Sequence, residues 1–130
     1  MKILVVDDEK AVEPLFTQWF ETEIEEGLFD FKFAFSAEEA IGLLGGTEYA
    51  DVVLILSDIN MPGMNGIELL KLIKKAYPNM VVMIITAYGD NYNYQMAMTN
   101  GADGFIKKPL DLSALKEKII DYAKKHNNPS

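Results

Sequence analysis

Five short apolar runs alternate with amphipathic helical stretches, and this alternation restricts the fold more than any other feature of the chain. The expected strands cover residues 2–6, 30–34, 52–57, 80–85 and 104–107. The runs at 2–6 and 52–57 are almost entirely apolar, as in strands that are buried on both faces. Strict alternation of strands and helices predicts an α/β, doubly wound fold, in which crossover helices cover both faces of a five-stranded parallel sheet.

The helical stretches carry their own start and stop signals. The expected helices cover residues 10–25, 36–44, 66–76, 91–100 and 112–123. Pro14 falls in the first turn of the first helix, where proline is tolerated. Ser36 and Glu39 have the spacing of a capping box, and Asp111 is placed to cap the last helix. Residues 124–130 are expected to form a frayed tail, and residues 1–130 to form a single domain.

Composition excludes several classes of function. The chain has no cysteine, which rules out disulfides and thiolate chemistry. Twelve basic against twenty acidic side chains give a net charge of −8, whereas nucleic-acid binding needs a basic surface. No apolar run approaches the roughly 20 residues of a membrane span, and no signal peptide precedes Asp7. We therefore expect a cytoplasmic protein that neither binds nucleic acid nor inserts into a membrane.

Reactive side chains gather where the expected strands end. They are Asp7, Asp8 and Glu9 after the first strand, Asp58 after the third, Thr86 after the fourth, and Lys107 and Lys108 after the fifth. Parallel sheets of this kind bind ligands beyond the carboxyl ends of their strands. Clustered carboxylates repel one another unless a hard cation such as Mg²⁺ lies between them. A carboxylate can also form an aspartyl phosphate, and a cation, an ammonium and a hydroxyl then neutralise the phosphoryl oxygens.

Each of these residues has a simpler interpretation when it is taken alone. An aspartate after a strand, such as Asp58, is often a turn former, and Asp7 or Asp8 could cap the following helix. Thr86 could be an ordinary residue at the end of a strand, and Lys108 a surface lysine. Their joint occurrence at four strand ends favours a single Mg²⁺ site for phosphoryl transfer, with Mn²⁺ as the alternative ion.

Four segments, taken in order, resemble the response regulator receiver family over about residues 2–122. They are Ile-Leu-Val-Val-Asp-Asp-Glu at 3–9, Ser-Asp-Ile-Asn-Met-Pro-Gly-Met-Asn-Gly at 57–66, Ile-Ile-Thr-Ala at 84–87 and Gly-Ala-Asp-Gly-Phe-Ile-Lys-Lys-Pro at 101–109. The resemblance implies a flavodoxin-like (βα)5 receiver fold with strand order 2-1-3-4-5. It also implies a phosphorylation-dependent switch of a two-component phosphorelay, which is not an enzyme beyond its own phosphotransfer and dephosphorylation.

The resemblance implies roles by position. Asp58 looks like the phosphoacceptor, which takes a phosphoryl group from a phosphohistidine. Asp8 looks like a direct Mg²⁺ ligand, Asp7 acts largely through water, and the backbone carbonyl of Asn60 is the third protein ligand. Lys108, directly before Pro109, looks like the partner of the phosphoryl group, and Lys107 is the competing candidate.

Further residues match the family's switch and output positions. Thr86 and Phe105 look like the switch pair, in which the hydroxyl moves toward the phosphoryl group and the ring turns inward. Asn60 and Tyr88 are expected to tune the lifetime of the phosphoryl group, and a large ring at Tyr88 predicts slow self-dephosphorylation. Tyr94 and Met98 share one face of the helix at 91–100, and we expect them to be partly exposed on a partner face.

The expected partners follow from the family resemblance. A sensor histidine kinase or a phosphotransfer protein would supply the phosphoryl group. A downstream protein, or an output domain outside this chain, would read the phosphorylated state, and phosphorylation could drive dimer formation. Both a stand-alone regulator and a receiver of a longer protein fit the sequence.

Three other readings stay open from the residues. A Mg²⁺-dependent phosphatase with an aspartate nucleophile would carry a second aspartate two residues on, where this chain has Asn60. A flavodoxin-like flavin binder would need a glycine-rich phosphate loop after the first strand, which the sequence lacks. A receiver that only docks, without phosphorylation, would not need Asp7, Asp8, Asp58, Thr86 and Lys108 together.

Overall fold

The five expected strands form one parallel sheet in the computed structural model, which describes residues 1–86, 90–108 and 111–127, with side chains of the last segment described to Tyr122. The strands are β1 (Lys2–Val6), β2 (Asp30–Ala34), β3 (Val52–Asp58), β4 (Val81–Thr86) and β5 (Gly104–Lys107). Their order in the sheet is β2-β1-β3-β4-β5, and every neighbouring pair is parallel. The doubly wound α/β fold and the strand order are therefore confirmed.

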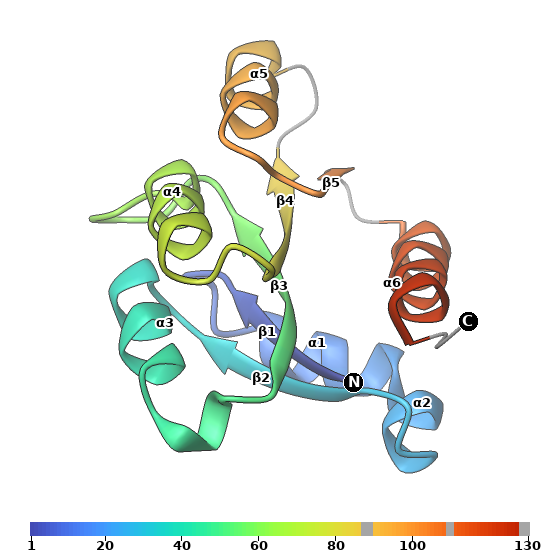
Figure 1. Cartoon of the computed structure of the whole chain (residues 1–130). Helices are drawn as coiled ribbons and strands as arrows, with labels where there is room; N and C mark the ends of the chain where they lie inside the picture. Colours follow the sequence, from blue (N-terminus) through green and yellow to red (C-terminus); the bar gives the residue numbers. More distant parts are fainter. Residues whose placement is uncertain (87–89, 109–110, 128–130) are drawn as a thin grey trace.

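Helices cover both faces of this sheet. One face carries α1 (Val12–Trp19), α2 (Glu21–Glu25) and α6 (Leu112–Asn127), and the other carries α3 (Ala37–Leu44), α4 (Gly66–Ala76) and α5 (Asn91–Thr99) (Figure 1). A 3-10 turn, η1 (Thr47–Tyr49), precedes β3. None of the helices in the described part of the chain is both long enough and apolar enough to cross a bilayer.

Alternate residues of the central strands feed two separate cores. Leu4 and Ile55 point toward α3, α4 and α5, whereas Val5 and Leu54 point toward α1 and α6. All four side chains are at most 1% exposed. Because side chains alternate along a strand, a strand buried on both faces must be apolar throughout, and only its ends are free to carry charge.

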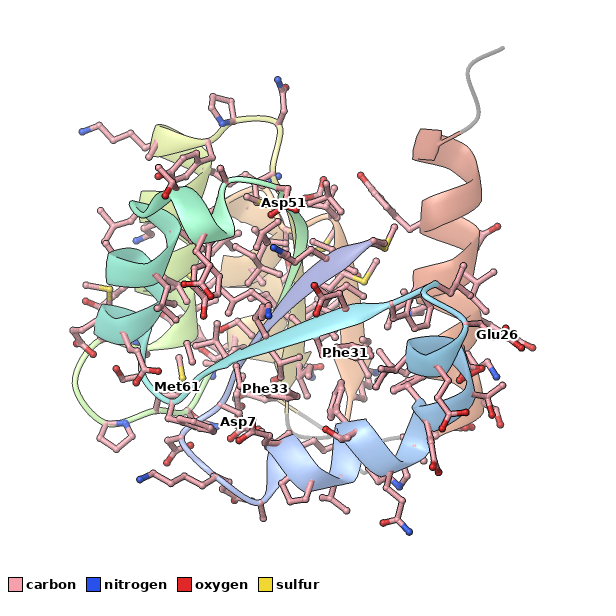
Figure 2. All side chains as sticks on the ribbon, turned by 90° about the horizontal axis from the view of Figure 1, so that it is seen from below. Asp7, Glu26, Phe31, Phe33, Asp51 and Met61 are labelled. Carbon is pink, nitrogen blue, oxygen red and sulfur yellow. The ribbon has the colours of Figure 1, made fainter. Side chains whose placement is uncertain are left out.

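Aromatic rings fill much of the core between α1 and β2. Phe16 and Phe20 of the α1 region meet Phe29, Phe31 and Phe33 at centroid distances from 5.2 to 6.3 Å, most of them edge-to-face or tilted. Figure 2 shows Phe31 and Phe33 along β2. Such pairs add about 0.5–1.5 kcal/mol beyond the burial of their area, so this cluster fixes α1 against the edge of the sheet.

The single helix expected over residues 10–25 is wrong, because the chain breaks it at Phe20. The backbone of Phe20 has φ −111° and ψ 26°, which separates α1 from α2. The break leaves the Phe20 ring 1% exposed among its aromatic neighbours. It also places Glu23 of α2, 7% exposed, in an ion pair with Lys116 of α6. The described residues therefore form six α-helices where five were expected.

Side-chain caps define several helix starts. Asp111 accepts the N–H groups of Ser113 and Ala114 at 3.0 and 3.2 Å, as the sequence predicts. The Ser36 hydroxyl accepts the Glu39 N–H at 3.0 Å, which is one half of the expected capping box, and no described bond runs from the Glu39 side chain back to Ser36. A reciprocal capping box at Asn65 and Glu68 opens α4, with bonds of 2.9 and 3.3 Å. Its spacing was readable in the sequence and was missed.

The last helix is longer than expected. α6 continues to Asn127, so residues 124–127, which we expected in a frayed tail, are helical. Residues 128–130 lie outside the described part of the chain. Leu115 and Ile119 are fully buried in the core that α6 shares with α1 on this face of the sheet, as the helical spacing predicts.

The Glu23–Lys116 ion pair allows a test of whether it stabilises the packing of α2 against α6. Lys116→Ala is expected to lower the free energy of unfolding by about 1–2 kcal/mol, because it leaves a nearly buried carboxylate without its cation. Urea denaturation measures this loss. In a Glu23→Gln background the same lysine change should cost clearly less, and an equal loss in both backgrounds would show that the two side chains are not coupled.

Candidate functional site

The register of the sheet brings the reactive strand ends together. Val6 of β1 pairs with Ser57 of β3, so the next residues along, Asp7 and Asp58, lie side by side. Further across the sheet, Thr86 of β4 pairs with Lys107 of β5. Figure 2 shows Asp7 beyond the end of β1, at this carboxyl edge of the sheet. The expected gathering of side chains from β1, β3, β4 and β5 is therefore present.

Three carboxylates form the centre of this site. Asp7, Asp8 and Asp58 each offer an oxygen, and these oxygens lie within 4.8 Å of one another. Asp7 and Asp58 are 8% and 5% exposed, while Asp8 is exposed. A set of carboxylate oxygens with one open, solvent-facing side suits Mg²⁺, which binds through one or two carboxylates and keeps several waters. The donor set therefore fits this ion.

Burial and crowding raise the pKa of Asp7 above its usual value. Removal from water is the largest cause, and the nearby charges of Asp58 and Asp8 act in the same direction. The Glu9 N–H, which donates to Asp7 Oδ1 at 3.0 Å, and the Lys108 ammonium oppose the shift without cancelling it. The three carboxylates therefore hold their negative charge at an energetic cost, and a bound cation would remove that cost.

Lys108 supplies the positive charge of the site. Its Nζ lies 3.0 Å from Asp58 Oδ2, while its backbone N–H donates to the Thr86 carbonyl at 2.7 Å. Burial works against the ammonium, but the hydrogen bond and charge of Asp58, with Asp7 and Glu9 beyond, raise the pKa of Lys108. Lys107 is the exposed last residue of β5. Of the two lysines considered from the sequence, Lys108 is the one that pairs with Asp58.

Thr86 presents an unsatisfied hydroxyl. The residue is 1% exposed, and its Oγ1 has no hydrogen-bond partner among the described residues. A buried hydroxyl without a partner costs about 1–3 kcal/mol. Thr86 follows Ile85 in β4. Ile85 pairs with Ile106 of β5 on one side and with Asp58 of β3 on the other. Within the described part of the chain, the hydroxyl is therefore available for a hydrogen bond to a group that binds at this edge.

Ser57 and Gly66, which the sequence analysis did not single out, hold the backbone around Asp58. The Ser57 hydroxyl donates to the Asp58 carbonyl at 2.9 Å. Gly66, the first residue of α4, packs so closely that a Cβ there would lie 2.2 Å from the same oxygen. The Asn60 N–H approaches Asp58 Oδ1 at 3.4 Å, a long contact, and Asn60 is exposed. Close packing of this kind is a tertiary effect, and only the presence of glycine at a helix start hinted at it.

The expected switch and partner residues lie beside β5. The Phe105 ring is partly buried and meets Tyr94 of α5 edge-to-face, with centroids 4.5 Å apart. Tyr94 and Met98 are 37% and 46% exposed on α5. Tyr94 and Phe105 also line a hollow that continues onto Leu115 and Lys118 of α6. Tyr88, the expected lifetime residue, lies outside the described part of the chain.

Comparison with known proteins gives the family. A family model described as the response regulator receiver domain matches residues 3–120. The chemotaxis protein CheY homolog of Campylobacter jejuni is 35% identical over 123 residues, which cover 93% of this chain and 91% of that protein. The crystal structure of a CheY-like receiver domain protein from Methanospirillum hungatei superposes with a TM-score of 0.84 at 29% identity, covering 99% of this chain and 98% of that one.

Longer relatives match the same segment. The response regulator protein FleR of Pseudomonas aeruginosa is 34% identical over 122 residues, which cover 94% of this chain and 24% of that protein. This chain therefore spans about a quarter of that relative's length. The family match over residues 3–120 and the shared fold show that the chain belongs to the response regulator receiver domain family.

Proposed function

We propose that the chain is a phosphorylation-dependent switch in which Asp58 accepts a phosphoryl group from a phosphohistidine. One observation carries the proposal: three carboxylate oxygens lie within 4.8 Å of one another, and the Lys108 ammonium lies 3.0 Å from Asp58 Oδ2. Membership of the receiver family supports phosphorylation-dependent signalling as the general role. The assignment of individual residues below is our proposal.

The proposed transfer would use the Asp58 carboxylate, a bound cation and the Lys108 ammonium. An Asp58 carboxylate oxygen attacks phosphorus, a P–O bond forms, the P–N bond of the phosphohistidine breaks, and the freed imidazole takes up a proton. A Mg²⁺ ion held by Asp7, Asp8, Asp58 and the Asn60 carbonyl would neutralise phosphoryl charge. Lys108 would exchange its bond to Asp58 Oδ2 for one to a phosphoryl oxygen. Asn60 and Tyr88 are the proposed lifetime-tuning residues.

The response is proposed to run through Thr86 and Phe105. The unpaired Thr86 hydroxyl would turn toward the new phosphoryl oxygens, since a charged acceptor offers the bond that it lacks. The space it leaves would let the Phe105 ring move inward and change its contact with Tyr94. Moving such a two-state element from 1:99 to 99:1 takes about 5.5 kcal/mol of differential interaction. Tyr94 and Met98 belong to the proposed output face.

The partners and location follow from this role. We infer a histidine kinase or phosphotransfer protein as phosphodonor, a downstream protein or output domain as reader, and a cytoplasmic setting. Dimer formation on phosphorylation belongs to the same proposal. The partly exposed Tyr94 and Met98 support a protein reader, because aromatic residues and methionine are enriched at interfaces. The net charge of −8 supports an interaction with protein rather than with nucleic acid.

Phosphorylation itself is the first test. Incubation with acetyl phosphate and Mg²⁺ should add the mass of one phosphoryl group, about 80 Da, to the intact protein, because the Asp58 carboxylate would act as nucleophile beside the Lys108 ammonium. The gain should be absent in Asp58→Asn and strongly reduced in Lys108→Ala. Lys107→Ala is the matched control and should phosphorylate as wild type does. A mass gain that persists in Asp58→Asn would place the phosphoryl group elsewhere and overturn the proposal.

The crowded carboxylates predict opposite effects on stability and metal binding. Asp7→Asn should stabilise the metal-free protein by about 1 kcal/mol at pH 7, because the neutral amide relieves burial and repulsion of the charge. Since the folded pKa of Asp7 is raised, the wild-type disadvantage should shrink as pH falls through that pKa. Thermal unfolding between pH 4 and pH 8 measures this trend. Stabilisation by Mg²⁺ should be weaker in the variant; equal stabilisation would remove Asp7 from the site.

Removal of the Thr86 hydroxyl is also expected to have different effects on stability and on the response to phosphorylation. Thr86→Val replaces the unpaired hydroxyl by a methyl group of similar size, and it should leave the unphosphorylated protein as stable or about 1 kcal/mol more stable. The variant should still gain phosphoryl mass, yet the change that phosphorylation causes in the Phe105 and Tyr94 ring signals should shrink. NMR of the two rings follows this change. An undiminished response would exclude Thr86 from the switch.

A further inference from the structure

Glu38, the second residue of α3, reaches across to the loop that follows Asp58. Its Oε1 accepts the backbone N–H of Met64 at 2.9 Å. Gly63, next to Met64, has a φ of +76°, and a Cβ at that position would lie 3.0 Å from the same Glu38 oxygen. Glycine thus provides both the left-handed backbone and the space that the carboxylate occupies. The contact joins α3 to a loop that leads directly from β3 to α4.

Other described hydrogen bonds hold the two ends of the 59–65 loop. At its start, the Asn60 N–H approaches Asp58 Oδ1 at 3.4 Å; at its end, the Gly66 N–H donates to the Ile59 carbonyl at 2.9 Å and Asn65 forms the capping box with Glu68. The Met61 side chain is 8% exposed in the core beneath α3, and Figure 2 shows it close to that helix. Among the described hydrogen bonds, the one from Met64 to Glu38 is the bond that ties this loop to a side chain of α3.

The charge of Glu38 suits this role. The Met64 N–H holds the pKa of Glu38 below its usual value, so the carboxylate stays ionised at neutral pH. Glu38 also lies in the first turn of α3, where the free N–H groups of the helix favour a negative side chain. Glu39, the next residue, carries the same charge in the same turn, but its backbone N–H bonds to Ser36 and its side chain makes no described bond to the loop. The two glutamates therefore form a matched pair.

We propose that Glu38 is a positioning residue for the phosphoacceptor site, which anchors the 59–65 loop so that the Asn60 backbone carbonyl faces the three carboxylates. The inference rests on the proposed function, in which this carbonyl is a Mg²⁺ ligand. Glu38 touches neither the ion nor the phosphoryl group and acts through the Met64 and Gly63 backbone. Loss of the anchor would let the loop sample positions in which the carbonyl points elsewhere, and the site would bind Mg²⁺ less tightly.

The test measures Mg²⁺ binding directly by calorimetry. Glu38→Ala should raise the Kd for Mg²⁺ by about three- to tenfold, the range expected for losing one hydrogen bond of ordinary net strength. Hydrogen exchange at the Met64 amide should quicken in the same variant. Glu38→Gln keeps an acceptor oxygen and should restore most of the affinity, while Glu39→Ala, which removes the same charge from the same turn, should bind as wild type does. A merely structural loss would lower stability without changing the Kd of the folded protein.

The outcomes separate this inference from the function beneath it. If wild type binds Mg²⁺ and gains a phosphoryl group while Glu38→Ala keeps the wild-type Kd, the positioning role is wrong and the proposed function stands. If Glu39→Ala weakens binding as much as Glu38→Ala, general charge rather than the anchor sets the affinity, which also overturns the inference. If wild type binds no Mg²⁺, the proposed metal site fails and the inference fails with it.

Discussion

Repulsion among Asp7, Asp8 and Asp58 is the interaction on which the rest of the site depends. Three carboxylates within 4.8 Å are balanced in the protein itself by the Lys108 ammonium, which reaches one of them. Burial, together with the charges of Asp58 and Asp8, raises the pKa of Asp7, and a cation bound here would relieve the repulsion. Such a cluster lowers stability in isolation, so its presence at a buried edge is the kind of local conflict expected of functional sites.

The sheet limits the destabilising effect of this repulsion by confining the three carboxylates to one edge. β1 and β3 are buried on both faces, so their interiors are fixed by packing, and charge can enter only where the strands end. Parallel register then sends all those ends to one edge, with Asp7 beside Asp58 and Thr86 next along. The two cores on either side therefore do more than stabilise the fold. They hold the charged residues at fixed separations, which a loop-borne site could not do as rigidly.

The apolar pattern of the strands and the residues at their ends predicted most of the fold and the gathering of the reactive side chains. The five strands agree with expectation because apolar runs specify strands, and their order agrees with what the family resemblance implies. Parallel topology dictates which strand ends meet, so the gathering of Asp7, Asp58 and Lys108 at one edge was also expected. The break at Phe20 was not predictable from helical spacing, since aromatic packing with Phe29 and Phe31 from a distant segment overrides local preference. Glu38 was missed because its role depends on a contact with Met64, 26 residues away, and Gly66 because the close approach of the Asp58 carbonyl depends on how the intervening loop folds back.

The buried Thr86 hydroxyl and the carboxylate cluster support the same inference about the proposed switch. Among the described residues the buried Thr86 hydroxyl has no hydrogen-bond partner, and the Asp7 carboxylate has a raised pKa beside two like charges. In the function proposed above, a phosphoryl group with its cation would relieve both, and the free energy released would be available to move Phe105 against Tyr94. Because a ligand can shift an equilibrium only by its differential interaction with the two states, these groups would be the source of the switching energy in that proposal.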